Sequence, residues 1–512
     1  MKKHNEYLDS ISVEPALHRK IMRTVTEPQK RPYQKRTVFR YVAVAACAVV
    51  LLFGIWIIPG FWGDQQQANG LIVQELENQQ PDRDNVPPLS PPFVPIVPPD
   101  RTFAAIALNY VDTAPLIEPQ WDVPDPEAAQ AARGANDFAF RLSAALVNNI
   151  GQDNFVVSPY SVWMPLAALL NAADEAHQPA LLEALGIGGI TPADINRAVS
   201  RMLFDLTNEN ARQWGWDEAL QANPMHIANA IFVDRNQAIR QDFAQTFMDY
   251  FRGEMISVDF LDPVAVEEVN LWASDHTHGL ITEVVQDFDP LTVAAIANAV
   301  FFSDRWIHQF DPAQTQRDIF HSPAGESAAY FMQMEWPVTL YFEDERVQAV
   351  NLPFMGRGGM KIILPKDGDA AGLLASMTSE YFERMHDESV FAEGRLMLPR
   401  FSVENTLDNL TDSLIALGVP LFNAAEAPLT GGLIKEDMPV WLSNAVQVAM
   451  IAVDEEGATA AAVTAIGLAG SGIMEIMTTF EMICNHPFVF ILHSYTLDGG
   501  RQVLFTGVVN RP

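Results

Sequence analysis

The chain has 512 residues, of which 49% are hydrophobic and 19% charged, so it can bury a large core and still carry additional segments. Its formal net charge of −32 argues against a nucleic-acid-binding role, because phosphates would be repelled, and favours basic partners. The two cysteines, Cys47 and Cys484, provide no disulfide framework, and we expect Cys484 to be a small buried hydrophobe.

A membrane anchor is predicted close to the N-terminus. Residues 41–58 contain no charge, and the apolar stretch continues to residue 62, which is long enough to span a bilayer. Residues 1–40 hold ten Lys/Arg and four Asp/Glu, whereas the remainder has a formal charge of −38. We therefore expect a cytoplasmic tail at 1–40, one transmembrane helix at 41–62 and an extracytoplasmic remainder, which makes a single-pass cell-membrane protein.

Three other interpretations of this apolar run are weaker. A cleaved signal peptide has a short basic region and a small-residue cleavage site, but here forty residues precede the run and Phe61-Trp62 follow it. Residues 44–47 resemble a lipoprotein processing site, yet eleven apolar residues follow Cys47. A buried core helix would need apolar partner segments nearby.

Residues 63–126 are predicted to form a stalk. Prolines are dense at 85–100, where they favour an extended polyproline helix and a semi-rigid spacer. The same residues could serve as a docking peptide for a proline-reading module, which is the less favoured use. Residues 102–112 would add either a strand or a helix to the domain surface.

The segment 127–512 is predicted to be one mixed α+β domain. Apolar residues recur at helical spacing in 127–150, 181–187, 195–208 and 268–285, with the last helix ending near Gly279. Strand patterns occur at 227–234, 294–303, 338–344, 360–365, 395–405 and 486–510. Asp498-Gly499-Gly500 marks a hairpin turn in the last of these.

Motifs of catalysis or metal binding are missing from the sequence. It has no His-Glu-x-x-His, no Gly-x-Ser-x-Gly and no Cys-x-x-Cys. His276 and His278 lie two residues apart, so on a helix they would point to different sides and make a poor metal pair. We expect no metal, no cofactor and no enzyme activity.

Six segments of the domain together resemble the serpins, the family of large serine-protease inhibitors. Their motif residues are a Ser-Pro-x-Ser element, a strand-to-Trp signature and a His-Pro-Phe element near the C-terminus. The segments are 154–173 with Ser158, Pro159 and Ser161; 269–281; 298–310 with Asn298, Phe302, Trp306 and Phe310; 351–368; 398–419; and 486–492 with Pro487 and Phe488. They follow the family's order and cover essentially all of 128–512.

The resemblance implies a serpin fold with three β-sheets, about nine helices and an exposed reactive-centre loop. A target serine protease cleaves the loop, and at the acyl-enzyme stage the N-terminal part of the loop inserts into the main sheet. The protease is thereby trapped covalently. The implied partner is a serine protease, with a cysteine protease as the second candidate, and the inhibitor is expected to be a monomer.

The segment that begins at Gly457 has a composition that permits such insertion. Alternate residues from Ala458 to Leu468 would share one face of a strand, which begins small and ends apolar. The opposite face lacks charge and proline, either of which would obstruct insertion. An Ala-rich helix or linker would not explain this period of two. The predicted hinge is Glu455, Glu456, Gly457, Ala458, Thr459, Ala460, Ala461 and Ala462. We expect the two glutamates to remain solvated.

The scissile bond is placed by family spacing from Gly457 and lies in the window of Gly470, Ser471, Gly472, Ile473 and Met474. Counting back from Pro487 puts it nearer Ile476-Met477. No Arg or Lys lies between Gly457 and Glu481, which disfavours trypsin-like targets. Small and aliphatic residues suit an elastase- or subtilisin-like enzyme.

One departure from the family pattern falls at Gln447, where many serpins have a histidine. The resemblance makes Ser158, Ser161 and Asn298 its neighbours, in a cluster that controls opening of the sheet. Glutamine both donates and accepts hydrogen bonds but does not titrate near neutral pH.

Two rival functions remain from the sequence. A non-inhibitory serpin-fold protein would act as a binding or structural module at the cell surface, and it would be expected to have bulky or charged hinge residues. A membrane-anchored enzyme would need a catalytic constellation.

Overall fold

A computed structural model describes residues 125–512 apart from 149, 207–224, 278–281, 289–291, 303, 356–357, 408–409, 435–437, 444, 446, 459–477 and 497–499. The predicted anchor at 41–62, residues 63–124 of the predicted stalk and the loop residues 459–477 lie outside the described residues. The last residue of the predicted stalk, Pro126, instead begins α4. Among the helices described, none combines the length and apolarity needed to cross a membrane.

Nine α-helices occur in the described part, in agreement with the expected number. They are α4 (Pro126–Val147), α5 (Pro159–Ala168), α6 (Gln178–Ala184), α7 (Pro192–Leu206), α10 (Gln241–Phe251), α11 (Val264–His276), α12 (Ala370–Ala375), α13 (Ser379–Asp387) and α14 (Leu410–Ala416). The four predicted helical segments are all confirmed, with α11 ending at His276, just before the expected Gly279. Asp125 caps α4 through a 2.9 Å hydrogen bond from the Ala128 amide, and Pro126 occupies the first turn.

Three sheets are described, as expected, and the largest has nine strands. Its order is β1 (Phe155–Val157), β16 (Arg501–Val509), β15 (Phe488–Tyr495), β9 (Gly359–Pro365), β8 (Val347–Pro353), β7 (Gly325–Glu343), β10 (Val390–Pro399) and β14 (Thr478–Ile483), with β6 (Gln316–Ser322) paired to β7. The predicted terminal hairpin is confirmed, because β15 and β16 pair antiparallel from Phe488↔Val509 to Tyr495↔Arg501.

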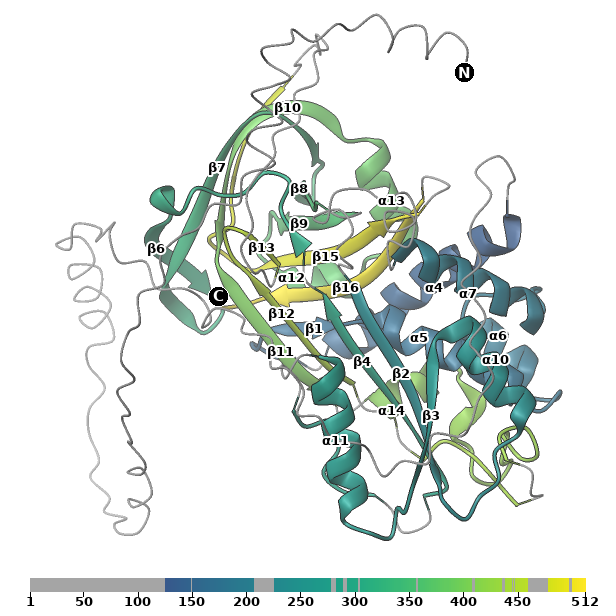
Figure 1. Cartoon of the computed structure of the whole chain (residues 1–512). Coiled ribbons are helices and arrows are strands. Elements are labelled where there is room, and N and C mark those ends of the chain that lie inside the picture. Colours follow the sequence, from purple (N-terminus) through teal and green to yellow (C-terminus); the bar gives the residue numbers. More distant parts are fainter. Residues whose placement is uncertain are drawn as a thin grey trace, which may run out of the picture. The chain divides into compact units, whose positions relative to one another are not determined.

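Two smaller sheets lie beside each other, and Figure 1 shows β2, β3 and β4 of one in the lower half of the picture, next to β11 and β12 of the other. One has the order β11 (Phe401–Leu407), β12 (Gln447–Val453), β13 (Gly457–Ala458) and β5 (Asp304–Arg305); the other has β3 (Gly253–Val258), β2 (Met225–Asp234) and β4 (Ala294–Phe302). Strands β4 and β12 are neighbours in space, yet within the described residues no backbone pairing joins them. The two sheets therefore meet at an unpaired boundary.

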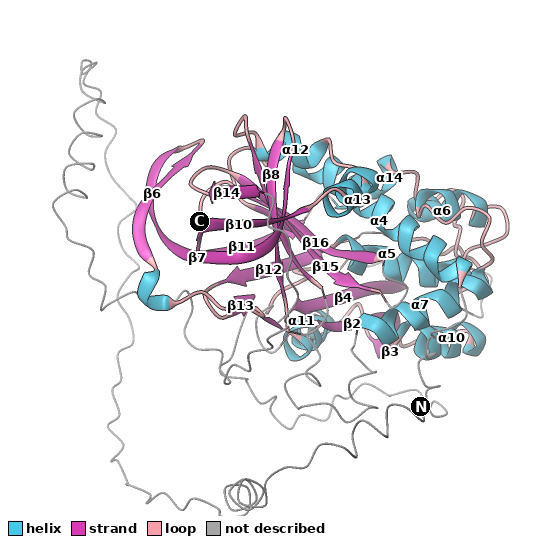
Figure 2. Cartoon of the chain, turned by 90° about the horizontal axis from the view of Figure 1, so that it is seen from above, coloured by secondary structure: helices cyan, strands magenta, loops and turns pink. Residues whose placement is uncertain are grey.

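The core lies on both sides of this boundary. On one side, α5 is buried along its whole length and belongs to the larger hydrophobic cluster, together with Ala449, Ile451 and Val453 of β12. On the other side, α11 covers a smaller cluster in which the rings of Trp272 and Phe232 meet edge to face at 5.8 Å. Figure 2 shows the helices α4, α5 and α7 gathered on one side of the sheets.

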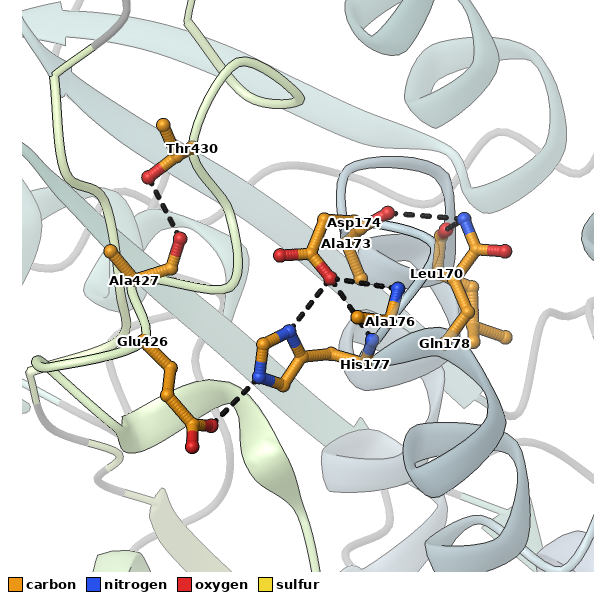
Figure 3. Close-up of polar contacts among 9 residues, drawn as sticks. All are labelled: Leu170, Ala173, Asp174, Ala176, His177, Gln178, Glu426, Ala427 and Thr430. Atoms are coloured by element: carbon orange, nitrogen blue, oxygen red, sulfur yellow. Dashed lines mark hydrogen bonds and ion pairs between the residues drawn. The ribbon is translucent and has the colours of Figure 1, made fainter.

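A histidine held by two carboxylates ties the segment before β12 to the start of α6. His177 Nδ1 lies 2.7 Å from Asp174 Oδ1, and its Nε2 lies 2.8 Å from Glu426 Oε2 (Figure 3). The contacts to Glu426 and Asp174 raise the pKa of His177 despite its partial burial. The Asp174 amide also donates to the Pro428 carbonyl at 2.9 Å, so backbone and side chains fix this loop together.

Candidate functional site: the hinge and the sheet-opening cluster

The predicted hinge is already part of a sheet. Val453 pairs antiparallel with Ala458, and Gly457 and Ala458 pair antiparallel with Arg305 and Asp304 of β5. A Cβ on Gly457 would lie 2.1 Å from the Asp304 carbonyl oxygen, so only glycine fits this position. The first two residues of the expected insertion thus occupy a strand position between β12 and β5.

A tight turn leads the chain from β12 into β13. The Asp454 amide donates to the Gly457 carbonyl at 3.0 Å, and the Asp454 carboxylate accepts from the amides of Glu456 and Gly457 at 2.9 and 3.2 Å. Burial raises the pKa of Asp454, although the two amides oppose this effect. The turn reverses the chain so that any continuation after Ala458 runs back along β12.

Trp306 holds this turn in place. Its indole donates to the Asp454 carbonyl at 3.0 Å, and its own amide donates to the Glu456 carbonyl at 3.0 Å. The ring is buried and stacks on Phe354 with centroids 4.6 Å apart. The amide of Phe310 donates to the Glu455 carbonyl at 3.0 Å, so both signature aromatics bind the hinge through their backbone or side chain.

Glu455 corrects one expectation, because it is only 4% exposed and does not remain solvated. Arg400 meets it with a bidentate contact in which Nε lies 2.9 and 2.8 Å from the two carboxylate oxygens and Nη2 lies 2.7 Å from Oε1. The hydroxyl of Thr315 donates to the same carboxylate at 2.5 Å. A buried carboxylate requires such partners, which explains why the residue can leave solvent. Glu456 is half-buried.

Gln447 joins β12 to the N-terminus of α5. Its Oε1 accepts from the Ser158 amide at 2.9 Å, while its Nε2 donates to the Ser158 carbonyl at 2.9 Å and to Ser161 Oγ at 2.6 Å. Ser161 Oγ donates to the Ser158 carbonyl, and Ser158 Oγ to the Leu504 carbonyl, each at 2.9 Å. The expected neighbours Ser158 and Ser161 are therefore present. The cluster's control of sheet opening stays a prediction.

Asn298 lies on β4, in register with Asn229 of β2, and its side chain is outside the described part. Pro487 and Phe488 are buried, with Phe488 opening β15. Thr459 to Ala462 and the window from Gly470 to Met474 lie outside the described residues. Cys484 is fully buried as expected, and burial raises the pKa of its thiol, which makes it a poor nucleophile.

A cavity of about 50 Å³ lies at the boundary between β4 and β12. It is mainly apolar and sits next to the Gln447 cluster. Its lining residues are Ser161, Val162, Pro165, Leu166, Ile296, Leu410, Leu414, Leu442, Ala445 and Gln447. The pocket is partly open to solvent, so part of its apolar lining has no packing partner.

Sequence reasoning missed the partners of Glu455 and a contact that holds α11. Arg400 lies in the family-like segment 398–419 and Thr315 in a segment without any motif; only folding brings them to the hinge. On α11, Trp272 Nε1 donates to Glu254 Oε2 at 3.0 Å and His276 Nε2 lies 3.3 Å from Glu254 Oε1. The spacing of His276 and Trp272, four residues apart on a helix, was the available signal.

Comparison with known proteins finds the same family over the whole described domain. The family model described as "Serpin (serine protease inhibitor)" matches residues 133–512. An uncharacterized serpin-like protein of Thermococcus kodakarensis is 29% identical over 394 residues, which cover 74% of this chain and 84% of the relative. Corticosteroid-binding globulin of Oryctolagus cuniculus is 25% identical, covering 73% and 94%.

Among solved structures, the crystal structure of a thermophilic serpin, tengpin, in the native state superposes with a TM-score of 0.67. It is 25% identical in sequence and covers 80% of this chain and all of the tengpin chain.

Proposed function

Because the chain belongs to the serpin family, whose function is of the protease-inhibitor type, we propose that it traps a serine endopeptidase of elastase or subtilisin type covalently. The reactive loop would insert between β4 and β12 after cleavage. The single observation that carries the proposal is the position of β13, in which Gly457 and Ala458 are already paired at the entrance to that boundary.

The register of β13 supports an insertion path. If the chain continued from Ala458 in the same register, Ala462 would lie opposite Ala449 on one side and Val300 on the other. Thr464 would then reach Gln447 and Asn298, and Leu468 would reach Ala294, the first residue of β4. The inserted strand would therefore end just before the predicted cleavage window.

The two faces of the inserted strand match the two clusters. Residues directly opposite each other in a sheet share a face, so even-numbered loop residues would join Ala449 and Ile451 on the larger core. Ile466 would lie opposite Ala445 and Ile296, which both line the cavity. Insertion would thus place an apolar side chain at the void that the native state leaves open.

The chemistry requires no group of this chain beyond the loop itself. The protease's serine oxygen attacks the scissile carbonyl, and the amine of the following residue leaves as a new N-terminus, which produces an acyl-enzyme ester. Insertion must outpace hydrolysis of that ester. About ten backbone hydrogen bonds, each contributing ~1 kcal/mol net, favour insertion by roughly 10 kcal/mol before apolar burial is added. A cysteine protease would form a thioester in the same way.

We place the inhibitor outside the cell membrane, anchored as a monomer through residues 41–62 and a stalk at 63–126. The charge difference between the basic tail and the acidic remainder supports this topology. The lack of Arg and Lys between Gly457 and Glu481 supports a target that cleaves after small or aliphatic residues.

A second candidate function is non-inhibitory binding, which the similarity to corticosteroid-binding globulin favours. Inhibition and non-inhibitory binding are distinguished by mixing the full-length protein with an elastase and, separately, with a subtilisin. An inhibitor forms a complex that survives boiling in detergent; a binding protein is only cleaved. Ala462→Arg should abolish the complex, because a buried charge obstructs insertion, while the matched Ala462→Ser retains it. Cleavage without a complex for both proteases contradicts the proposal.

A further inference from the structure

Exposed apolar side chains gather at one end of β7 and β10. Leu340 and Phe391 are 40% and 43% exposed, and their Cα atoms are direct partners in the antiparallel register, so both side chains lie on the outer face of the sheet. In the next pair, Tyr341 is buried on the other face, where it stacks on Phe480 at 4.5 Å, while Val390 is 47% exposed near the start of β10. An exposed aromatic beside an exposed leucine is a common feature of a protein-binding surface.

Carboxylates surround this pair. Glu393 lies two residues after Phe391 on the same face, and Glu335 and Glu481 lie opposite Arg395 on the flanking strands. All three glutamates are exposed. Arg395 is engaged, since it lies 3.2 Å from Glu481 and donates to Gln333 at 2.8 Å. We call Leu340, Phe391, Glu335, Glu393 and Glu481 the outer strip.

The outer strip adjoins the point where the loop re-enters the fold. Thr478 begins β14 and pairs with Ala392, the neighbour of Phe391. The window from Gly470 to Met474 is four to eight residues from Thr478, a span of at most about 13–26 Å. A protease domain is roughly 40 Å across, so this end of the sheet is within reach of an enzyme engaged with the window.

We propose that the outer strip is a docking surface for the target protease, which binds it through an apolar contact framed by basic side chains. The inference rests on the proposed function. Charge argues against two other occupants of the outer strip, the stalk of this chain and a second copy of the protein. Residues 63–126 contain ten Asp/Glu and two Arg, and a second copy carries a net charge of −32, so the acidic strip would repel both. A protease with Lys and Arg around its active site is attracted.

The test measures the second-order rate constant of inhibition of a basic elastase by the full-length protein. Leu340→Ser combined with Phe391→Ser should lower it about tenfold, with the stoichiometry of inhibition unchanged, because aromatic anchors dominate such contacts. The matched control is Leu261→Ser, an exposed leucine (72%) in the loop between β3 and α11. Glu393→Lys should lower the rate severalfold at 20 mM salt and not at 500 mM.

Unfolding curves like that of the unsubstituted protein show that each variant is folded. Equal rates for the double variant and for Leu261→Ser would overturn the docking surface. If the elastase only cleaves the loop and forms no complex, the trap fails, but the docking surface is still tested: kcat/KM for loop cleavage should fall in the double variant and not in the control.

Discussion

At the scale of single residues, the hinge depends on a charge pair that sequence patterns do not reveal. Glu455 and Arg400 are separated by 55 positions and meet in a site where neither is solvated. A buried pair costs desolvation, so its net contribution is modest, but an unpaired partner left behind is strongly destabilising. This asymmetry gives the first prediction.

Arg400→Met should lower the free energy of unfolding by about 3–5 kcal/mol, because the Glu455 carboxylate would stay buried without its counter-ion. The matched control is Arg395→Met, which removes an exposed pair with Glu481 and should cost less than about 1 kcal/mol. Urea unfolding measures both. Equal midpoint shifts for the two variants would show that the pair at the hinge is no stronger than a surface contact.

A second residue-scale prediction concerns Lys361, which is buried on β9 close to two histidines. Burial, helped by Arg501 and opposed by Glu383, lowers the pKa of Lys361 to about 7. Burial also lowers the pKa values of His386 and His493, whose rings lie 5.1 Å apart. Between pH 7 and 10.5 the unfolded chain therefore binds more protons than the folded chain.

Stability should accordingly rise with pH in that range, by up to about 1.4 kcal/mol per pH unit. Lys361→Met should remove this slope, whereas Lys366→Met, a change at an exposed lysine paired with Glu343, should keep it. Unfolding midpoints at pH 7, 8 and 9 measure the difference. If the unfolding midpoints of the unsubstituted protein, Lys361→Met and Lys366→Met changed with pH in parallel, Lys361 would have the same pKa in the folded and unfolded chains.

At the scale of elements, α11 is the helix that covers the boundary into which the loop would insert. Val448 of β12 and Trp272 of α11 belong to the same cluster, so a new strand beside β12 would contact this helix. The contacts of Glu254 with His276 and Trp272 therefore hold in place a helix that would have to move if the loop inserted as proposed. The strength of this contact depends on pH.

Burial opposes protonation of His276, but the Glu254 carboxylate and the Trp272 carbonyl outweigh it and raise the pKa of His276. A raised histidine pKa stabilises the folded state below pH 6.5, and this stabilisation is lost as pH rises through the folded-state pKa. Burial likewise opposes ionisation of Glu254, yet the contact with His276 lowers the pKa of Glu254. The ionised Glu254 therefore stabilises the folded state above pH 4.5, and this stabilisation is lost as pH falls through the lowered pKa.

Docking of α11 should therefore be tightest between about pH 4.5 and 6.5 and loosen at higher pH. Hydrogen exchange of the α11 amides, corrected for intrinsic rates, should speed up severalfold from pH 6 to pH 8. His276→Gln should show no such change across this interval. A pH-dependent rate that persists in His276→Gln would assign the effect to another group.

At the scale of the whole molecule, the two small sheets are an incomplete larger sheet. Strands β4 and β12 lie side by side without backbone pairing in the described part, and β13 begins a strand between them. Both flanking cores are preformed, so completing the sheet would require separation of the two edges and displacement of α11. The proposed function requires the native state to be less stable than a form with one more strand.

Cleavage between Gly470 and Met474 should therefore raise Tm by more than about 10 °C, since ~10 kcal/mol is gained and each kcal/mol shifts a large domain by at least a degree. The Ile466→Asp variant should be cleaved equally well, but its Tm should rise less on cleavage, because insertion would bring a charge to the apolar cavity. Calorimetry of cut and uncut protein measures both. An unchanged Tm after complete cleavage would exclude an inserted form.

Much of this molecule is predictable from the sequence because the signals are local. Helical spacing identified α4 and α11, short strand-like runs identified β2, β4 and β9, and the Asp-Gly-Gly turn identified the β15–β16 hairpin. The ordered family-like segments predicted the serpin fold, and the small side chains after Gly457 predicted where a strand could enter. Two of the three neighbours predicted for Gln447, Ser158 and Ser161, bind it, whereas the contact with Asn298 stays a prediction.

The burial of Glu455, the boundary between β4 and β12, and the register of β13 were decided by tertiary structure alone. Each depends on residues far apart in the chain, and the free energy of a charge or a strand edge is set by what packs against it, not by its sequence neighbours. Sequence therefore predicted which segment would become a strand. Only the folded chain determined that its first two residues already are one.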